Sequence, residues 1–382
     1  MLYAVLFGVL RVDRRLAHLT APDMLDVKDQ GIALQAEAFR DKDLLPVYGS
    51  SEFRNDTRFS GRRFFADYPT GFRLFIIGKA GSKTLITAER IGALGDAVRG
   101  RKVVIILSPT WFLTEKETAA SYAGNFSAAQ AGKLIFDSPL SHSLKSRLAR
   151  EMLKYPKTLS PHPLLRLELD RLARKDRGIE TRLLSSAGRA AAYFVALWDR
   201  METPFALLPE VLQSPGGLAE TGPHAKTTPP WARLTKRAAR HSSPELWEEE
   251  QDTGAPKLER KLRGKDKLPF VAEISRSDEW QHLSLLMETL KQLGARPLFI
   301  SLPLNADAFE IAGVKPADLD YYYARLRDEV RDYGFPVVTF EDEQNDPWFF
   351  HDSVGHPSSM GWMILNHTIN RFYHGKLPTS LD

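Results

Sequence analysis

Three apolar runs, each ending at a tight turn, constrain the fold of this chain more than any other feature. They cover residues 44–48, 72–77 and 102–107, and end respectively at Gly49, Gly78 and Ser108-Pro109. Continuous apolar runs of this length are typical of strands buried on both faces. The segments between the runs have helical patterns, and strand–helix alternation predicts a parallel sheet.

The same alternation resumes near the C-terminus. Leucines at helical spacing precede Gly294, a residue type that commonly follows the last turn of a helix, and Ser277 is a candidate cap at the start. A strand at 296–303, a helix at 317–333, a strand at 335–340 and a helix at about 358–373 follow. We therefore predict a three-layer α/β/α fold with a parallel sheet of about five strands.

A long insertion, about residues 113–270, separates the third and fourth expected strands. Residues 113–208 are rich in Ala, Leu, Arg and Lys at helical spacing and predict helices placed to cover the strand edge. Proline and glycine in residues 204–230 predict an extended loop. Residues 231–268 are dense in charge of both signs, which favours a solvated helical arm over a docking surface for a phosphate-bearing polymer or an acidic partner.

The N-terminus begins with an apolar run, Met1–Leu10, followed by Arg11, Arg14 and Arg15. Ten residues are half of the roughly 20 that a spanning helix needs, and the small-residue cleavage site of a signal peptide is missing. Two interpretations stay open. Residues 1–20 are an apolar segment packed on a single domain at 21–375, or they are the end of a short or truncated membrane anchor.

Composition excludes several kinds of site. The chain has no cysteine, so disulfides, thiolate metal sites and a cysteine nucleophile are excluded. The ten histidines are scattered without the spacing of a zinc site, and no glycine motif for a nucleotide is present. We expect no metal, no cofactor and no nucleic-acid partner. The net charge of +4 permits anionic partners without requiring them.

Two distant stretches carry candidate chemistry. Ser50 and Ser51 follow the first expected strand, and the loop before the last helix contains His351, Asp352 and His356. A serine hydroxyl is a poor nucleophile unless an imidazole takes its proton, and a carboxylate commonly orients that imidazole. Because ligands bind outside the carboxyl ends of parallel strands, the two stretches are expected to meet there.

Other residues near these stretches have simpler interpretations. Trp362 opens the last helix and is expected in the core, as is Trp111 by default, although either ring is also suited to line a pocket. Glu52 is a second group near the serine turn or, more simply, a helix-capping carboxylate. The acidic loop at 341–346 lacks the spacing of a calcium loop and is expected to be a solvated turn.

A serine first and an Asp/His loop last resemble the SGNH-hydrolase superfamily. More closely, the chain resembles the DltD family, which acts in D-alanylation of teichoic acids. The motifs that carry this resemblance are Tyr48-Gly49-Ser50-Ser51-Glu52, Gly78-Lys79-Ala80-Gly81-Ser82, Ser108-Pro109-Thr110-Trp111-Phe112, Ile300-Ser301-Leu302-Pro303 and Asp352…His356…Gly361-Trp362. They span residues 44–362, and the first and last motifs are the most specific.

The resemblance implies an SGNH-hydrolase-like, flavodoxin-like fold and a role for each matching residue. Ser51 would be the nucleophile, His356 the general base and acid, and Asp352 the residue that orients His356. Ser51 itself, with Gly78 or Gly81, would supply the N–H groups of an oxyanion hole, and Ser50 would also belong to the oxyanion-hole or substrate-binding region.

Two features depart from the family pattern. Asp352 and His356 are one residue further apart than in Asp-x-x-His, with Gly355 placed to absorb the difference. The asparagine that many SGNH hydrolases use in the oxyanion hole is not evident near Ser108.

The resemblance also implies an activity. The protein would form a D-alanyl ester on Ser51 and pass the acyl group to a polyol-phosphate or other cell-envelope polymer, such as lipoteichoic acid. It would be anchored in the cell membrane and face outward, and a membrane-bound acyltransferase and a D-alanyl carrier protein would supply the donor. Two alternatives stay open: an SGNH-type esterase or thioesterase that transfers the acyl group to water, and a non-catalytic assembly factor that binds carrier protein or polymer.

Overall fold

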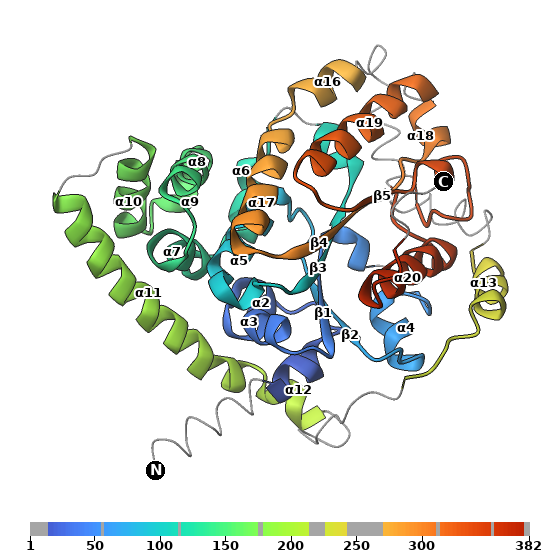
Figure 1. The fold of residues 1–382 in the computed structure, drawn as a ribbon, viewed down its shortest axis with the longest axis horizontal. Coiled ribbons are helices and arrows are strands. Elements are labelled where there is room, and N and C mark those ends of the chain that lie inside the picture. The colour runs from blue at the N-terminus through green and yellow to red at the C-terminus, as the bar shows by residue number, and fades with distance from the viewer. Residues whose placement is uncertain are drawn as a thin grey trace.

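A five-stranded, fully parallel sheet forms the centre of the protein (Figure 1). This computed structural model describes residues 14–54, 57–113, 116–174, 179–213, 226–242, 270–310, 314–352 and 355–377. The strands are β1 (Leu44–Tyr48), β2 (Arg73–Ile77), β3 (Lys102–Leu107), β4 (Arg296–Ser301) and β5 (Val337–Thr339), in the order β2-β1-β3-β4-β5. The predicted sheet is therefore confirmed, and its order is that of flavodoxin-like folds.

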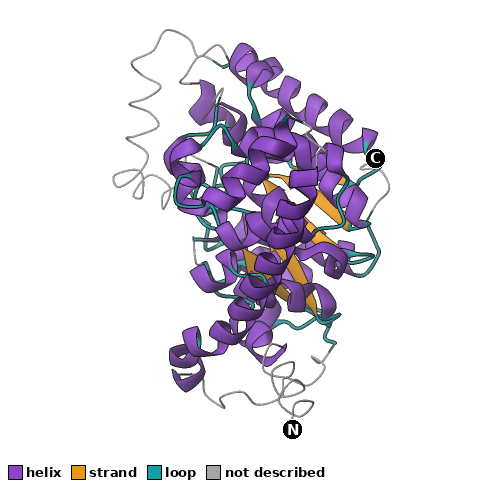
Figure 2. Ribbon diagram, turned by 90° about the vertical axis from the view of Figure 1, so that its left-hand side faces the viewer, coloured by secondary structure: helices purple, strands orange, loops and turns teal. Residues whose placement is uncertain are grey.

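Helices cover both faces of the sheet, as a three-layer fold requires. Alternate strand residues point to opposite faces: Tyr48 and Ile105 join one buried cluster, and Val47 and Val104 join the other. The first face carries α3 (Ala33–Arg40), α5 (Thr84–Leu94), α17 (Glu279–Leu293) and α19 (Pro316–Asp332); the second carries α4 (Gly61–Asp67) and α20 (Ser359–Tyr373). Helices stand in front of the strands when the molecule is seen from its insertion side (Figure 2).

The insertion between β3 and β4 is helical, as predicted. Its described helices are α6 (Ala119–Asn125), α7 (Ala128–Asp137), α8 (His142–Met152), α9 (Pro156–Leu159), α10 (Pro163–Ala173), α11 (Ile179–Ala206), α12 (Leu208–Gln213), α13 (Trp231–Ala239) and α16 (Phe270–Arg276). α7 packs on α5 and α11 packs on α7, so these helices form an outer layer beside the sheet (Figure 1). α6 contacts the loop after β2, because the Ser121 hydroxyl donates to the Gly81 carbonyl at 2.8 Å.

Two expectations about the insertion are wrong in part. The loop expected at 204–230 is helical at its start, because α11 continues through Pro204 and α12 follows, with Leu207 only 1% exposed between them, whereas the described residues 226–230 are in neither helix nor strand. The described start of the charged stretch is a helix with exposed charges, as expected, but it is not a free arm: α13 packs on α20, and Trp231 stacks on Phe64 with ring centroids 5.1 Å apart. Burial of apolar side chains outweighs local composition at both places. Residues 214–225 and 243–269 lie outside the described residues.

The first described residues form a helix, 14–20, whose Leu16 and Ala17 are buried in the larger cluster. Buried Lys28 fixes its end by donating to the carbonyls of Thr20 and Ala21, at 2.8 and 3.2 Å. Burial lowers the pKa of Lys28 to about 7. The apolar run at 1–10 lies outside the described residues, and none of the helices described is both long and apolar enough to cross a membrane.

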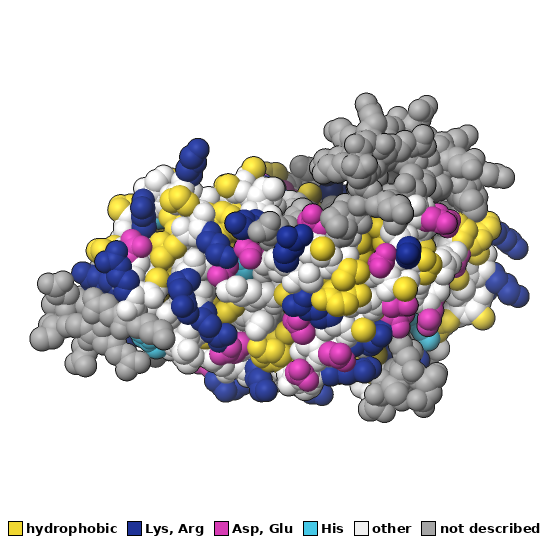
Figure 3. All heavy atoms as spheres, turned by 90° about the horizontal axis from the view of Figure 1, so that it is seen from above, with side chains coloured by type: hydrophobic (Ala, Val, Ile, Leu, Met, Phe, Trp, Pro, Cys, Tyr) yellow, Lys and Arg dark blue, Asp and Glu magenta, His cyan; other side chains and the backbone are white. Residues whose placement is uncertain are grey.

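The remaining short elements are α2 (Asp26–Gln30), η1 (Ser51–Phe53), η2 (Gly95–Val98), η3 (Pro109–Leu113), α18 (Ala306–Glu310) and η4 (Glu341–Glu343). η4 is partly exposed, in line with the turn expected for the acidic loop. On the face of the molecule seen in Figure 3, Lys and Arg side chains are interspersed with Asp and Glu side chains. Where that face consists of described residues, charges of both signs are mixed.

Candidate active site

The serine turn lies where the strand order reverses. β1 pairs with β2 on one side and with β3 on the other, and the sheet continues from β3 to β4. In such sheets this switch point, at the carboxyl ends of the strands, is where ligands bind. Ser51 is partly exposed there, as the first residue of the one-turn helix η1 that follows β1.

Three predicted residues meet at this turn. The Ser51 Oγ lies 2.9 Å from His356 Nε2, and the Asp352 Oδ2 lies 2.5 Å from His356 Nδ1. With the ring proton on Nδ1, the imidazole donates to Asp352 and accepts the hydroxyl proton of Ser51. Of the two candidate histidines, His356 and His351, it is His356 whose ring contacts Ser51. This arrangement is able to carry a proton away from Ser51.

The loop around Asp352 accommodates the extra residue between Asp352 and His356. The Asp352 Oδ1 accepts the N–H groups of Gly355 and His356, each at 3.1 Å. Gly355 adopts φ +103°, a backbone conformation that favours glycine. The backbone N–H of His351 donates to the carbonyl of His356 at 2.8 Å and closes the loop. One carboxylate thus fixes both the loop and the ring.

The environment favours an ion pair between His356 and Asp352. Burial disfavours the charged form of both groups, but their mutual hydrogen bond and attraction outweigh it. The pKa of Asp352 is therefore lowered and the pKa of His356 is raised from the usual values. An imidazole stabilised in its charged form is a stronger base toward Ser51.

Glu52 holds the backbone of the turn. Its buried Oε1 accepts the N–H of Ser50 at 2.7 Å, and Ser50 is the residue that precedes η1. The carboxylate thus satisfies the N–H of the residue before η1, in line with the capping role expected from sequence. Burial raises the pKa of Glu52. A Cβ on Gly49 would stand only 1.9 Å from Glu52 Oε1, so close approach rather than a positive φ requires glycine there.

Ser50 and the two loop glycines have structural partners. The buried Ser50 hydroxyl accepts the N–H of Gly81 at 3.0 Å and lies 3.3 Å from the Lys79 carbonyl, to which it donates. The N–H of Gly78 donates to Asp29 Oδ1 at 2.9 Å. Both N–H groups already have acceptors, which argues against the oxyanion-hole role expected for Gly78 and Gly81. Ser50 instead joins the turn after β1 to the loop after β2.

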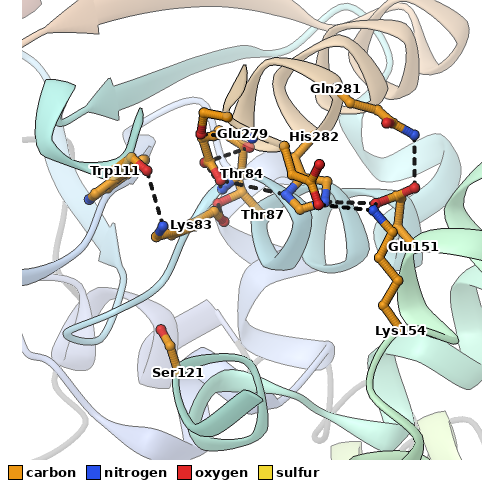
Figure 4. A network of polar contacts seen from close by, with 12 residues as sticks. Lys83, Thr84, Thr87, Trp111, Ser121, Glu151, Lys154, Glu279, Gln281 and His282 are labelled. Carbon is orange, nitrogen blue, oxygen red and sulfur yellow. Dashed lines mark hydrogen bonds and ion pairs between the residues drawn. The ribbon is translucent and has the colours of Figure 1, made fainter. Parts of the chain in front are cut away.

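Buried polar side chains also stabilise the loop after β2. Arg90, which is 1% exposed, donates to the Ser82 hydroxyl at 2.8 Å. Glu279 Oε1 accepts both the N–H and the hydroxyl of Thr84, at 3.0 and 2.8 Å (Figure 4). Side chains of α5 and α17 therefore hold residues 78–84 in place beside the serine turn.

Sequence reasoning missed Asp29, Ser121 and Glu279 as supports of the site. They lie on α2, α6 and α17, far from the serine turn in sequence. Each is one polar residue among others in its helix, so no spacing or motif singles it out. Only the structure distinguishes Asp29 and Glu279, because it shows these acidic side chains to be 2% and 3% exposed.

Two tryptophans, possible metal ligands and one cavity were also considered as parts of a site. Trp362 is 1% exposed and stacks on Phe53, with ring centroids 6.2 Å apart, and Trp111 is also buried. Both tryptophans belong to the core. Among the described residues, no group of three or more His, Asp or Glu side chains is arranged to hold a metal ion. A cavity of about 430 Å³ lies elsewhere, between α3, α7 and α11, and no residue of the Ser51 site lines it.

Comparisons with known proteins agree on one family. The family model described as "DltD protein" matches residues 21–374. Protein DltD of Bacillus subtilis (strain 168) is 27% identical over 359 residues, covering 92% of this chain and 88% of that protein. Protein DltD of Staphylococcus aureus is 22% identical over 355 residues, covering 92% and 87%. Protein DltD of Lacticaseibacillus rhamnosus is 23% identical over 360 residues, covering 90% and 80%.

Proposed function

Because the chain belongs to the DltD family, we propose that it transfers a D-alanyl group to a hydroxyl of a cell-envelope polymer through an ester on Ser51. The observation that carries this proposal is the contact of His356 with both Ser51 and Asp352. It supplies a nucleophile, a base and an orienting carboxylate at the switch point of the sheet.

The first half-reaction loads Ser51. His356 Nε2 takes the hydroxyl proton as Ser51 Oγ attacks the carbonyl carbon of the acyl donor. The new Oγ–C bond forms, the bond from that carbon to the donor's sulfur or oxygen breaks, and His356 gives the proton to the leaving group. Asp352 holds the ring in the correct tautomer and stabilises its charged form. The N–H of Ser51 is the remaining candidate donor to the developing oxyanion.

The second half-reaction delivers the acyl group. A hydroxyl of the acceptor polymer loses its proton to His356 and attacks the ester carbon. The bond from that carbon to Ser51 Oγ breaks, and the proton returns to Oγ. Teichoic acids carry such hydroxyls, and a polyol-phosphate such as lipoteichoic acid is the acceptor we propose. If water takes the place of the acceptor, the same groups catalyse hydrolysis.

We propose that the protein works at the outer face of the cell membrane, with the apolar residues 1–10 as its anchor. A membrane-bound acyltransferase and a D-alanyl carrier protein would supply the acyl group. The apolar run supports an anchor, and family membership supports the partners.

The first test is covalent labelling of Ser51. A serine-directed phosphonate is expected to modify the wild-type protein on the peptide that contains Ser51, as measured by mass spectrometry. Ser51→Ala should show no adduct. Ser50→Ala is the matched control, because the Ser50 hydroxyl bonds to the Gly81 and Lys79 backbone and not to His356, so labelling should persist. If the phosphonate modifies Ser51→Ala at another residue, or does not modify the wild-type protein, Ser51 is not the nucleophile.

The second test separates transfer from hydrolysis and from a non-catalytic role. Purified protein, a D-alanyl donor and a polyglycerol-phosphate acceptor should yield acceptor-bound D-alanyl ester faster than free D-alanine. Free D-alanine alone would indicate an esterase. Envelope ester content that is unchanged in cells carrying Ser51→Ala would indicate an assembly factor.

A further inference from the structure

The long helix α11 and its continuation α12 present an apolar face to solvent. Large exposed side chains lie on them: Tyr193 (63% exposed), Phe194 (66%), Leu197 (40%), Trp198 (66%), Met201 (52%), Phe205 (78%), Leu208 (50%) and Leu212 (77%). Their spacing of three or four residues places them on one side of the helix. Scattered exposed apolar residues are ordinary on proteins, but a continuous stripe marks an interaction surface.

The opposite side of α11 is fixed to the domain. Ala192 and Thr203 of α11 are 6% and 2% exposed, and Leu207, between α11 and α12, is 1% exposed. The carboxylate of Asp199 accepts the N–H groups of Ile32 and Ala33, at 3.0 and 2.8 Å. The helix is therefore held by its inner side and lies along the outside of the molecule (Figure 1), and its outer side chains are left exposed.

The described chain begins on the same side of the molecule. Arg14 bonds to Asp41 at 2.8 Å, and the neighbouring Arg40 lines one cavity together with Ala196 and Arg200 of α11. Figure 1 draws the first described helix at the same end of the molecule as α12. Residues 11–13, which join the apolar run 1–10 to Arg14, span at most about 11 Å when extended. A membrane entered by that run therefore lies close to α11.

The composition of the stripe suits a lipid surface. Tryptophan and tyrosine favour the boundary between headgroups and acyl chains, and amphipathic helices with Trp, Phe and Leu on one face lie in that plane. Twenty-eight residues give α11 a length of about 42 Å. Beside the stripe, the cavity carries the cations Arg40, Lys133 and Arg200 against the carboxylates Asp96 and Asp137. This flank has no excess of acid that would repel anionic headgroups.

We propose that the exposed apolar face of α11 and α12 lies in the lipid–water interface of the membrane and fixes how the domain sits on it. This inference rests on the membrane anchoring within the proposed function, and adds a second contact that holds the domain against the bilayer. A second contact suits an enzyme whose acceptor polymer is attached to the membrane, because it keeps Ser51 at a constant height.

The absence of cysteine makes a direct test possible. Single-cysteine variants Leu197→Cys and Phe205→Cys of the full chain carry an environment-sensitive nitrobenzoxadiazole label. Asp332→Cys, at the exposed end of α19, is the control. On adding phosphatidylglycerol–phosphatidylcholine vesicles, the two α11 labels should brighten several-fold, shift to shorter wavelength and be quenched by spin-labelled lipid. The control label should not change.

Each other outcome overturns the proposal and points elsewhere. Labels at 197 and 205 that stay accessible to iodide on vesicle-bound protein would leave anchoring intact and refute docking of α11. Labels shielded without vesicles, with a doubled mass, would assign the stripe to a second copy. Labels shielded only after a membrane-bound acyltransferase is co-reconstituted would assign it to that protein. Absence of vesicle binding would refute docking and anchoring together, while phosphonate labelling of Ser51 tests the chemistry separately.

A charge-insertion variant checks the same surface independently of the probe positions. Phe194→Glu combined with Trp198→Glu should abolish the vesicle response of a label at 205. Phosphonate labelling of Ser51 should persist, which shows that the domain remains folded. An unchanged vesicle response in this variant would also contradict the proposal.

Discussion

Burial and the contact with Asp352 act on the pKa of His356 in opposite directions. In the proposed mechanism, their balance sets the pH at which Ser51 reacts. The contact with Asp352 prevails and raises the pKa of His356 above the usual 6.5. Only the neutral imidazole accepts the Ser51 proton, so the phosphonate labelling rate should rise with pH and level off above that raised pKa. Asp352→Asn removes the stabilising charge, so the inflection should move to lower pH. The plateau should also fall, by up to about 10⁴-fold as for comparable triads.

A pH series of labelling rates for the two proteins measures both effects. An inflection that stays in place in Asp352→Asn would show that another group, and not Asp352, raises the pKa of His356.

Gly49 is the second residue on which the site depends. A Cβ at this position would stand 1.9 Å from Glu52 Oε1 and 2.7 Å from the Phe53 ring, so Gly49→Ala forces the serine turn to move. Overpacking of this kind costs about 1–3 kcal/mol, and labelling of Ser51 should slow. Gly132→Ala is the matched control, because nothing lies within 4 Å of its Cβ in α7 and alanine favours helices. Denaturant unfolding and phosphonate labelling of both variants test this; equal stability of the two would refute it.

At the scale of elements, α3 depends on a cap supplied by another helix. Its first residue is preceded by Ile32, which has no capping side chain, and Asp199 of α11 accepts the N–H groups of Ile32 and Ala33 instead. Asp199→Ala should cost about 0.5–2 kcal/mol, as other lost N-caps do. Glu202→Ala, on the exposed side of α11, should change the free energy of unfolding by less than about 0.5 kcal/mol. Equal effects of the two changes in urea unfolding would contradict this role.

The contact between α17 and α8 should make stability depend on pH (Figure 4). Burial opposes the charge of His282, but Glu151 and Glu279 outweigh it and raise its pKa to about 9. A raised histidine pKa stabilises the fold fully below about 6.5, and this stabilisation is lost as pH rises through about 9. A shift of that size corresponds to roughly 3 kcal/mol. The stability advantage of wild type over His282→Gln should therefore shrink between pH 6.5 and 9.

Unfolding free energies at several pH values measure that advantage. Gln281→Ala is the control, because Gln281 also bonds to Glu151 but does not titrate, so its difference from wild type should stay constant. A His282→Gln difference that does not vary with pH would show that His282 is not charged in the folded protein.

The elements differ in how far their sequences predict them. Strands β1 to β3 follow from apolar runs, because a strand buried on both faces needs a continuous one. The helical residues 204–206 and 208–213 do not follow, since Leu207, at the turn between α11 and α12, is fixed by burial in the larger cluster. The meeting of Ser51, His356 and Asp352 was predictable from residue type and chain order. The partners of Gly78 and Gly81 were not, because Asp29 and Ser50 reach them only through the tertiary fold.

At the scale of the whole molecule, the site is completed by the last part of the chain. Ser51 and His356 are 305 residues apart, and Trp362 and the rest of α20 close the second face of the sheet. Lys102 of β3 donates to the carbonyls of Phe372 and Tyr373, at 3.0 and 2.7 Å, and holds the end of α20. The parallel sheet and its layers follow from strand–helix alternation, whereas the position of the helical insertion depends on contacts that no local pattern encodes.

This architecture predicts an uneven distribution of local stability. Every residue of α5 is buried between the sheet and α7, whereas α11 packs by one side only. Amides open most easily where few apolar contacts hold them. In hydrogen-exchange mass spectrometry without lipid, peptides from β3 and α5 should therefore exchange slowest, and peptides from 186–213 much faster. Equal protection of α5 and α11 would mean that the insertion and the sheet unfold as one cooperative unit, and that the outer layer is as much a part of the core as the helices beneath it.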